Sequence, residues 1–98
     1  MNQEIEALFR TRDEAVRAQN APLLLSTQIA ELDFGSSESY LAAQEMTTQV
    51  LHIHEESDDY LVVLVKETYR SKDKPARSAF PVYFLTYARK GLRIYKVR

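Results

Sequence analysis

Apolar side chains recur at helical spacing through the N-terminal part of the chain. Over residues 3–19, the positions spaced three and four apart carry Ile5, Leu8, Phe9, Arg12, Ala15, Val16 and Gln19. This is the pattern of an amphipathic helix with one stripe against a core. Asn20 and Pro22 interrupt it, and proline is tolerated only in the first turn of a helix. We therefore expect a second, short helix over residues 23–25 that forms a corner with the first.

The following segment predicts a strand and a third helix. Residues 27–34 have the pattern of a modest strand that stops at Gly35. Ser36 or Ser37 can then cap a helix that runs to about Met46.

From Thr48 onward the apolar pattern is typical of β structure. Four stretches are rich in β-branched, aromatic and leucine residues, at 48–55, 60–70, 79–88 and 92–98. The connections between them are short enough for hairpins, so the sequence predicts a four-stranded antiparallel meander.

The strand register decides which side chains share a face of this sheet. We take as pairs Glu55 with Tyr60, Tyr69 with Phe80, and Ala88 with Leu92. One face then carries His52, His54, Val63, Glu67, Tyr69, Phe80, Phe84, Leu92 and Ile94, and the other carries Ile53, Tyr83, Leu85, Tyr87 and Tyr95. Both faces are apolar, so one lies under the helices and the other is typical of a subunit interface. We expect the phenylalanine face under the helices, and a homodimer packed sheet to sheet through Tyr83, Leu85, Tyr87 and Tyr95.

Composition limits the classes of protein that this chain can belong to. Its 98 residues suit one domain, spanning 1–98, and 45% hydrophobic with 28% charged residues argue against disorder. The absence of cysteine excludes a disulfide framework, a thiol nucleophile and thiolate zinc sites. No apolar run reaches the length of a membrane span, and the N-terminus lacks the pattern of a signal peptide. We expect a cytoplasmic protein with no membrane partner.

Charge is distributed unevenly, although the net charge is only −1. Residues 1–65 carry three bases against twelve acids, and residues 66–98 carry ten bases against two acids. A basic half can meet nucleic acid or another polyanion. Alternatively, the acidic and basic parts complement each other within the fold or across a dimer. We favour complementarity, because ten bases spread over several strands and turns do not define a patch, and a nucleic-acid partner is therefore not expected.

The order helix, helix, strand, helix and four antiparallel strands resembles the nuclear transport factor 2-like (NTF2-like) superfamily, also called SnoaL-like or cystatin-like. EIEALFRTRDEAVRAQNAPLLLS resembles the first helix of that family with its turn into the second, and GLRIYKVR resembles its closing strand. The resemblance spans nearly the whole chain. It implies an α+β fold, α-α-β-α-β-β-β-β, in which a curved antiparallel sheet forms a cone around the helices. A pocket at the wide end and frequent dimers are also implied, as are members that include ketosteroid isomerases, dehydratases and polyketide cyclases.

Arg12 is the most informative single residue, because its helical position lies in the middle of the apolar stripe. It can project into the cone and bind an anionic ligand, since a guanidinium forms bidentate bonds with carboxylates. Alternatively, it pairs with Glu67 or Glu45, or extends its stem along the core to solvent.

Polar residues on the predicted strands add further candidates. His52 and His54 lie two apart and so share one face, where imidazoles can act as acid and base near neutral pH. Glu67 precedes Tyr69 on the same predicted face and is a candidate base if it is buried. Tyr40 offers a further hydroxyl. An H-x-H pair alone is a weak metal signal, and no nucleotide-binding or H-E-x-x-H motif occurs, so we expect neither a metal nor a cofactor.

These residues lead to the hypothesis of a dimeric small-molecule-binding domain of the NTF2-like type, with anionic ligands among those it can accept. The predicted pocket residues are Arg12, Tyr40, His52, His54, Glu67 and Tyr69. Two alternatives stay open. One is a lyase or isomerase that uses a histidine or Glu67 as its base in the cone. The other is a module that docks protein or nucleic acid through the basic C-terminal half. The sequence does not decide whether the chain is an enzyme.

Overall fold

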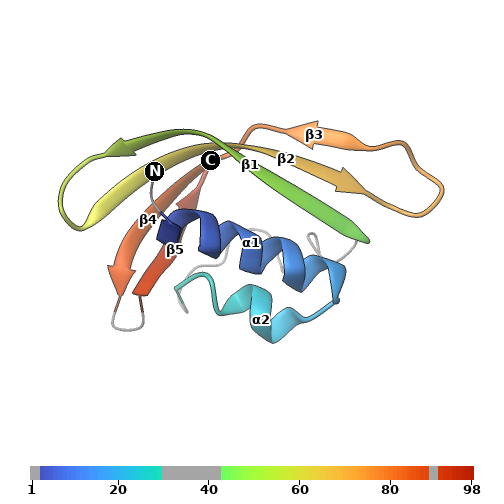
Figure 1. Cartoon of the computed structure of the whole chain (residues 1–98), viewed down its shortest axis with the longest axis horizontal. Coiled ribbons are helices and arrows are strands. Elements are labelled where there is room, and N and C mark those ends of the chain that lie inside the picture. The colour runs from blue at the N-terminus through green and yellow to red at the C-terminus, as the bar shows by residue number, and fades with distance from the viewer. Residues whose placement is uncertain (1–2, 30–42, 89–90) are drawn as a thin grey trace.

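Two helices and a curved antiparallel sheet make up the described part of the chain. A computed structural model describes residues 3–29, 43–88 and 91–98. Its elements are α1 (Gln3–Arg17), α2 (Ala21–Leu25), β1 (Glu45–Glu55), β2 (Tyr60–Arg70), β3 (Arg77–Ala79), β4 (Val82–Ala88) and β5 (Gly91–Val97). The sheet order is β1-β2-β4-β5, and β3 pairs with the same edge of β2 as β4, farther along that strand. The sheet arches over α1, which covers its concave face, and α2 packs against α1 on the side away from the sheet (Figure 1). The predicted α+β architecture is confirmed.

The corner between α1 and α2 forms as the sequence predicts. Gln19 adopts a left-handed φ of 55°, and the N–H groups of Gln19 and Asn20 donate to the carbonyls of Val16 and Ala15. These two bonds are those of a Schellman motif, which ends a helix. The side chain of Asn20 then accepts a hydrogen bond from the N–H of Leu23 at 3.1 Å and so caps α2.

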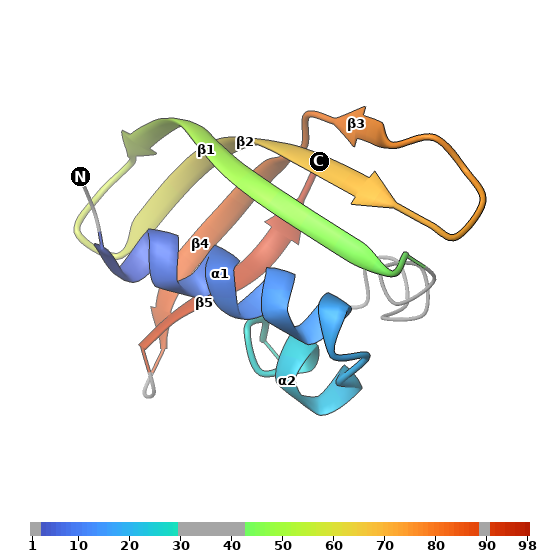
Figure 2. The ribbon, with the colours of Figure 1, turned by 45° about the vertical axis from the view of Figure 1, so that its right-hand side comes forward.

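The main core lies between α1 and the concave face, as the turned view also shows (Figure 2). The apolar stripe of α1 packs against alternate residues of β2, β4 and β5. The buried members of this cluster are Ile5, Leu8, Phe9, Leu61, Val63, Val65, Tyr83, Leu85, Leu92 and Ile94. Each fully buried side chain of this size stabilises the fold by roughly 1.5 to 3 kcal/mol relative to exposure.

The pairing of β1 with β2 differs from the prediction by one residue. Glu55 pairs with Leu61 rather than Tyr60, and the register shifts again between Val50 and His52. A displacement of one residue exchanges the faces of a strand. Ile53 therefore packs against the core, and His52 lies on the opposite, convex face.

The hairpin after β2 is tighter than the sequence analysis assumed. Tyr69 pairs with Arg77 and not with Phe80. A turn shortens the connection, in which the N–H of Lys74 donates to the carbonyl of Ser71 and Asp73 has a φ of 63°. The predicted strand 79–88 is also divided into β3 and β4 by Phe80 and Pro81, since proline has no N–H for the ladder.

This displacement by three residues exchanges the two faces of β4 relative to the prediction. Tyr83 and Leu85 lie in the core with no exposed surface, and Phe84 lies on the convex face between them. The expectation that the phenylalanine face lies under the helices is therefore wrong for β4. The predicted pair Ala88–Leu92 is also displaced by one, because Ala88 pairs with Gly91. The two errors cancel for β5, whose Leu92 and Ile94 face the core as predicted.

The predicted strand 27–34 and third helix fall mostly outside the described residues. Within the described part, Gln28 forms an isolated parallel bridge with Ile94. Met46 belongs to β1, so the helix does not extend to that residue. Neither described helix is long and apolar enough to cross a membrane.

The cap of α2 makes a measurable contribution to stability. Replacing Asn20 with alanine removes the acceptor for the N–H of Leu23, and we expect a loss of about 1 kcal/mol. In a domain of this size that corresponds to a fall in Tm of roughly 4 to 8 °C. Thermal denaturation followed by circular dichroism measures it. Asn20→Asp keeps the acceptor and should retain most of the stability; equal losses in both variants would contradict the capping role.

Candidate functional site

A cluster of polar side chains lies on the concave side, between α1 and the sheet. Arg12 and Glu67 are 0% and 1% exposed, and Thr27 is 2% exposed. Buried charged groups are uncommon, because removing an ion from water costs several kcal/mol unless other groups replace the water. This cluster contains the buried polar and charged side chains of the described core, Arg12, Thr27 and Glu67.

Arg12 reaches the cluster from the middle of α1. Its Nη1 donates to Thr27 Oγ1 at 2.7 Å and to Gln28 Oε1 at 3.4 Å. Thr27 Oγ1 in turn donates to the carbonyl of Leu24 at 2.6 Å. The guanidinium carbon also lies 5.4 Å from the centroid of the Tyr83 ring, within cation–π range. The segment after α2 and strand β4 together hold the guanidinium in place.

Glu67 lies in the same cluster, on β2. Its carboxylate accepts one hydrogen bond from the hydroxyl of Tyr69 and another from the hydroxyl of Tyr83. Tyr83 thus has Arg12 over its ring and Glu67 at its hydroxyl, while the edge of its ring meets Phe9 at a centroid distance of 5.0 Å. One aromatic side chain therefore links a buried cation to a buried anion.

The structure brings together three of the six predicted pocket residues. Arg12, Glu67 and Tyr69 all lie on the concave side. The two histidines do not, because His52 and His54 pair with Leu64 and Val62 on the convex face. Their separation from Glu67 follows from the register of β1 described above. The sixth residue, Tyr40, lies outside the described residues.

The four residues predicted to form the dimer interface are also divided. Tyr83 and Leu85 are completely buried in the core of one chain, so they are not available to a partner. Tyr87 is 41% exposed, and Tyr95 is partly exposed on the convex face. Of the four predicted interface residues, only Tyr87 and Tyr95 therefore lie at the surface.

Sequence reasoning missed Tyr83 and Thr27 as members of the polar cluster. Val82, Tyr83, Phe84 and Leu85 are all apolar or aromatic, so no alternation reveals which of them face inward. The sequence did contain one signal for the start of β4. Pro81 has no N–H to donate to a strand ladder, and β4 begins at the next residue. Thr27 carried no comparable signal.

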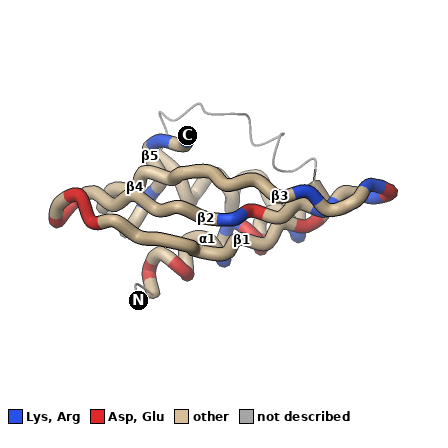
Figure 3. The backbone as a smooth tube through the Cα atoms, turned by 90° about the horizontal axis from the view of Figure 1, so that it is seen from above, with Lys and Arg blue, Asp and Glu red and all other residues tan. Residues whose placement is uncertain are grey.

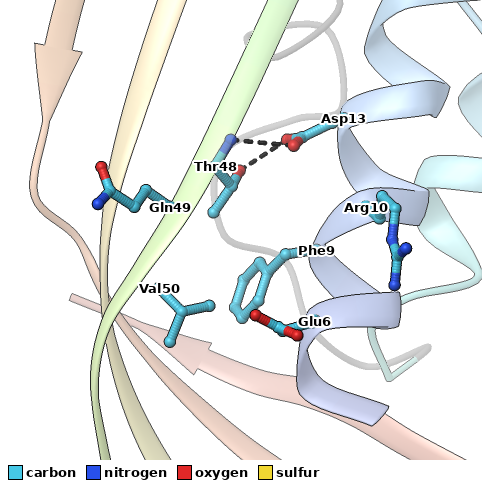
Figure 4. A pocket seen from close by; sticks show the side chains of 7 residues that line it. All are labelled: Glu6, Phe9, Arg10, Asp13, Thr48, Gln49 and Val50. Carbon is cyan, nitrogen blue, oxygen red and sulfur yellow. Dashed lines mark hydrogen bonds between the residues drawn. The ribbon is translucent and has the colours of Figure 1, made fainter. Parts of the chain in front are cut away.

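A second site lies in a groove between α1 and the edge strand β1 (Figure 4). The groove has a volume of about 380 Å³, and its lining residues are Glu6, Phe9, Arg10, Asp13, Thr48, Gln49 and Val50. Asp13 spans it: one carboxylate oxygen accepts the N–H of Thr48 at 2.9 Å and the other accepts its hydroxyl at 2.7 Å. Asp13 thereby covers a backbone donor of the edge strand, which otherwise invites pairing with another chain.

The environment of Asp13 disfavours its charged form. Partial burial raises the pKa of this carboxyl above its ordinary value of 3.8, while the hydrogen bonds from Thr48 and the charges of Arg12 and Arg17 oppose the shift. Burial is the largest of these effects.

Metal binding has no support in the described part of the chain. Within residues 3–29, 43–88 and 91–98, no group of three or more histidine or carboxylate side chains lies close enough to hold an ion. His54 does approach Glu56, with 3.9 Å between Nε2 and Oε1, but both side chains are exposed.

Comparison with known proteins identifies the fold. No protein-family model and no curated protein matches the sequence. An NTF2-like protein of unknown function from Shewanella oneidensis matches the structure with a TM-score of 0.76 at 10% identity, over 93% of this chain and 91% of that one. A domain with a cystatin-like fold from Nostoc punctiforme matches with a TM-score of 0.75 at 13% identity, over 95% of this chain and 72% of that one.

A third solved structure is a ketosteroid isomerase-like protein from Erwinia carotovora atroseptica. It matches with a TM-score of 0.65 at 17% identity, over 99% of this chain and 95% of that one. The resemblance inferred from sequence is confirmed at the level of the fold, which hosts many functions and does not by itself assign one.

Glu67 should be essential to the stability of the cluster. Glu67→Ala removes the acceptor of two tyrosine hydroxyls and opens a cavity, and we expect a loss of about 3 to 5 kcal/mol. Glu67→Gln keeps the shape and one oxygen acceptor, so its loss should be closer to about 1 kcal/mol. Urea denaturation measures both. Similar stability of the two variants would show that the hydroxyls do not depend on the carboxylate.

Asp13 should give stability a defined dependence on pH. Its folded pKa lies above the unfolded value, so the folded state binds the proton more tightly and the free energy of unfolding falls as pH rises between these two values. Asp13→Asn keeps partners for both Thr48 groups and lacks this titration. We therefore expect the variant to gain stability relative to the original chain from pH 4 to pH 7. Urea denaturation across that range tests this, and a difference independent of pH would refute it.

Proposed function

We propose that this chain, which has the fold of NTF2-like proteins, is a small-molecule-binding domain whose site is the concave side of the sheet. The observation that carries the proposal is the convergence of Arg12, Glu67, Tyr69 and Tyr83 on that side. Binding sites in proteins are clefts or cavities lined mostly by apolar side chains, with a few convergent polar groups that fix the orientation of the ligand. The concave side combines these polar groups with the apolar stripe of α1 and the valines of β2.

The polar groups define the class of ligand. A guanidinium recognises a carboxylate better than any other side chain does, whereas a carboxylate repels one and accepts hydrogen bonds from hydroxyl or amide groups. Arg12 lies over the ring of Tyr83, and Glu67 accepts a hydrogen bond from its hydroxyl. Arg12 and Glu67 are buried, so a ligand reaches them only by displacing the contacts that now cover them. The ligand that matches their chemistry is a small organic acid that carries a hydroxyl donor and an apolar body, with its carboxylate toward Arg12 and its hydroxyl toward Glu67.

A homodimer through the convex face is the second element of the proposal. The described helices lie against the concave face only, and partly exposed apolar side chains of β2, β4 and β5 occupy the other face. Exposed apolar patches on a sheet are typical of interfaces. Of the predicted interface residues, Tyr95 lies on this face, where its ring meets those of Tyr60 and Phe84.

A lyase or isomerase is the alternative function that a specific observation favours. Glu67 is a buried carboxylate with two phenol hydroxyls beside it, which are groups suited to proton abstraction and to stabilising an enolate oxygen. A histidine base does not fit this alternative, because His52 and His54 face away from Glu67. Turnover that disappears in Glu67→Gln without loss of fold would support it.

The binding proposal is tested with hydroxy acids as probes. Lactate, mandelate and 3-phenyllactate are titrated by calorimetry, with mandelamide as a neutral counterpart that lacks the carboxylate. We expect the acids to bind more tightly than the amide. Arg12→Met preserves the apolar stem and removes the charge, so it should weaken acid binding by roughly 10- to 100-fold.

Arg17→Met is the matched control, because Arg17 is an exposed arginine on the same helix and does not line the groove between α1 and β1. It should leave binding unchanged, and circular dichroism should show that both variants fold. Equal binding of mandelate and mandelamide, or acid binding that survives in Arg12→Met, would overturn the proposal.

A further inference from the structure

Five of the ten bases of the C-terminal half gather at one end of the sheet. They lie on the hairpin formed by the end of β2, the turn after it and β3, and we call residues 66–79 the basic hairpin. Its bases are Lys66, Arg70, Lys72, Lys74 and Arg77, and its acids are Glu67 and Asp73. Figure 3 shows this hairpin at the opposite end of the molecule from the acidic turn between β1 and β2. Bases that look dispersed in the sequence therefore form a local concentration of positive charge.

The other described residues do not neutralise this charge. Glu67 is buried, and its carboxylate accepts hydrogen bonds from two tyrosine hydroxyls of the core. The exposed acids at this end are Asp73 in the turn and Glu45, which pairs with Arg70 across the ladder. Between described residues, no ion pair involves any of the five bases. The molecule is 43 Å long and the Debye length is about 8 Å, so the acidic turn at the far end is screened from the hairpin.

An exposed aromatic ring lies beside these bases. Phe80 directly follows the basic hairpin and is 60% exposed, which makes it the most exposed large apolar side chain in the described part of the chain. β3 and β4 keep a single register against β2, and this register places Phe80 opposite Lys66. Side chains that lie opposite each other in an antiparallel ladder are about 5 Å apart at Cβ. A ring and a cation are therefore neighbours at the surface of the sheet.

The polar residues of the hairpin form a surface around this ring. Lys66, Thr68 and Arg70 alternate along β2 with residues that face the core, so they share the convex face. The hydroxyls of Thr68 and Ser78 lie 3.3 Å apart across the ladder, and all three residues of β3 are exposed. Lys66 and Arg70 are separated by about 14 Å along the strand. The exposure of β3 shows that packing within the fold does not account for the composition of the hairpin.

This surface is separate from the apolar side chains of the convex face. Those side chains gather beside the acidic turn, where Glu56 and Ser57 line the same hollow as Tyr60, Val62, Phe84 and Tyr95. The basic hairpin contributes no residue to that hollow. Any function of the hairpin is therefore independent of both the concave site and the apolar surface in the proposed function.

We propose that the basic hairpin and Phe80 bind single-stranded nucleic acid. Proteins that bind single strands combine bases that follow the phosphate backbone with aromatic rings on which nucleobases stack. Here the lysines and arginines of the hairpin contact successive phosphates, and one nucleobase stacks on Phe80. The hydroxyls of Thr68 and Ser78 lie between them and can donate to the sugar or phosphate oxygens.

The geometry favours a single strand over a duplex. A two-stranded ribbon can enter the major groove of a duplex. In this chain, however, β1 pairs with β2 as far as Arg70, so only the turn at 71–76 extends beyond a third strand. The bases of a duplex are also stacked on each other, and Phe80 cannot reach their faces. A single strand meets neither obstacle.

Fluorescence anisotropy with a fluorescein-labelled twelve-nucleotide thymidine oligomer tests the proposal on the full chain. We expect binding whose affinity falls steeply as salt rises, because phosphate contacts release counterions. A duplex of the same length, polyglutamate of similar charge, and vesicles of phosphatidylcholine and phosphatidylserine serve as competitors. Each should bind at least fivefold more weakly than the single strand. Equal or tighter binding of any of the three would overturn the proposal.

Substitution of Phe80 tests the stacking contact. Phe80→Ala removes the ring, and we expect at least a fivefold loss of affinity for the oligomer. Phe80→Tyr keeps a ring and should bind like the original chain, whereas Phe80→Leu keeps apolar bulk without a ring and should bind like Phe80→Ala. Circular dichroism checks that all three variants fold. Unchanged affinity in Phe80→Ala, or full affinity in Phe80→Leu, would refute the contact.

Substitution of the lysines tests the phosphate contacts. Lys72→Gln and Lys74→Gln should each weaken binding and lower the slope of log affinity against log salt by about 0.7. Arg17→Gln is the matched control, because it removes one exposed charge from α1, and it should change neither quantity. Equal effects of all three substitutions would reveal only the net charge of the chain and overturn the proposal. All of these variants retain the residues of the concave side, so the hydroxy-acid titrations stand or fall separately.

Discussion

Arg12 projects from the middle of the apolar stripe of α1, and the concave face of the sheet has to accommodate that charge. Tyr83 places its ring under the guanidinium, Thr27 accepts one of its hydrogen bonds, and the hydroxyl of Tyr83 continues to the carboxylate of Glu67. These contacts join α1, the segment after α2, and strands β2 and β4. Because a buried ion is stable only where other groups replace its water, these contacts fix how the helix lies on the sheet.

The two faces of the sheet differ in what covers them. α1 covers the concave face (Figure 1), whereas the convex face carries partly exposed apolar side chains of β2, β4 and β5. The acidic turn between β1 and β2 and the basic hairpin of β2 and β3 lie at opposite ends of the molecule (Figure 3). The same strands supply both faces, since successive side chains of a strand point to opposite faces. In β4, for example, Tyr83 completes the polar cluster and the adjacent Phe84 belongs to the convex surface. Alternate residues of one strand thus contribute to the buried polar cluster and to the convex surface.

The likeness to NTF2-like structures identifies the fold at 10 to 17% sequence identity. At that level the common features are the order of the elements and the curvature of the sheet, and not particular side chains. The candidate site therefore has to be argued from this chain alone. Arg12, Glu67 and Tyr69 were predicted for it because a charge in an apolar stripe, and two polar residues spaced by two in a strand, are visible in the sequence. Tyr83 was not, because Val82, Tyr83, Phe84 and Leu85 are apolar or aromatic at inward and outward positions alike.

Local patterns determined the two helices, the corner at Asn20 and the existence of the later strands, since these depend on residues close together in the chain. Tertiary structure decided which face of each strand is inward. The turn around Asp73 displaces β3 and β4 by three residues from the predicted pairing with β2, and the turn between β1 and β2 displaces β1 by one. Each odd step exchanges the faces of a strand. His52 and His54 left the predicted pocket for this reason, and Tyr83 entered the core. Apolar residues on both sides of β4 gave periodicity nothing to distinguish, so only packing against α1 settled the outcome.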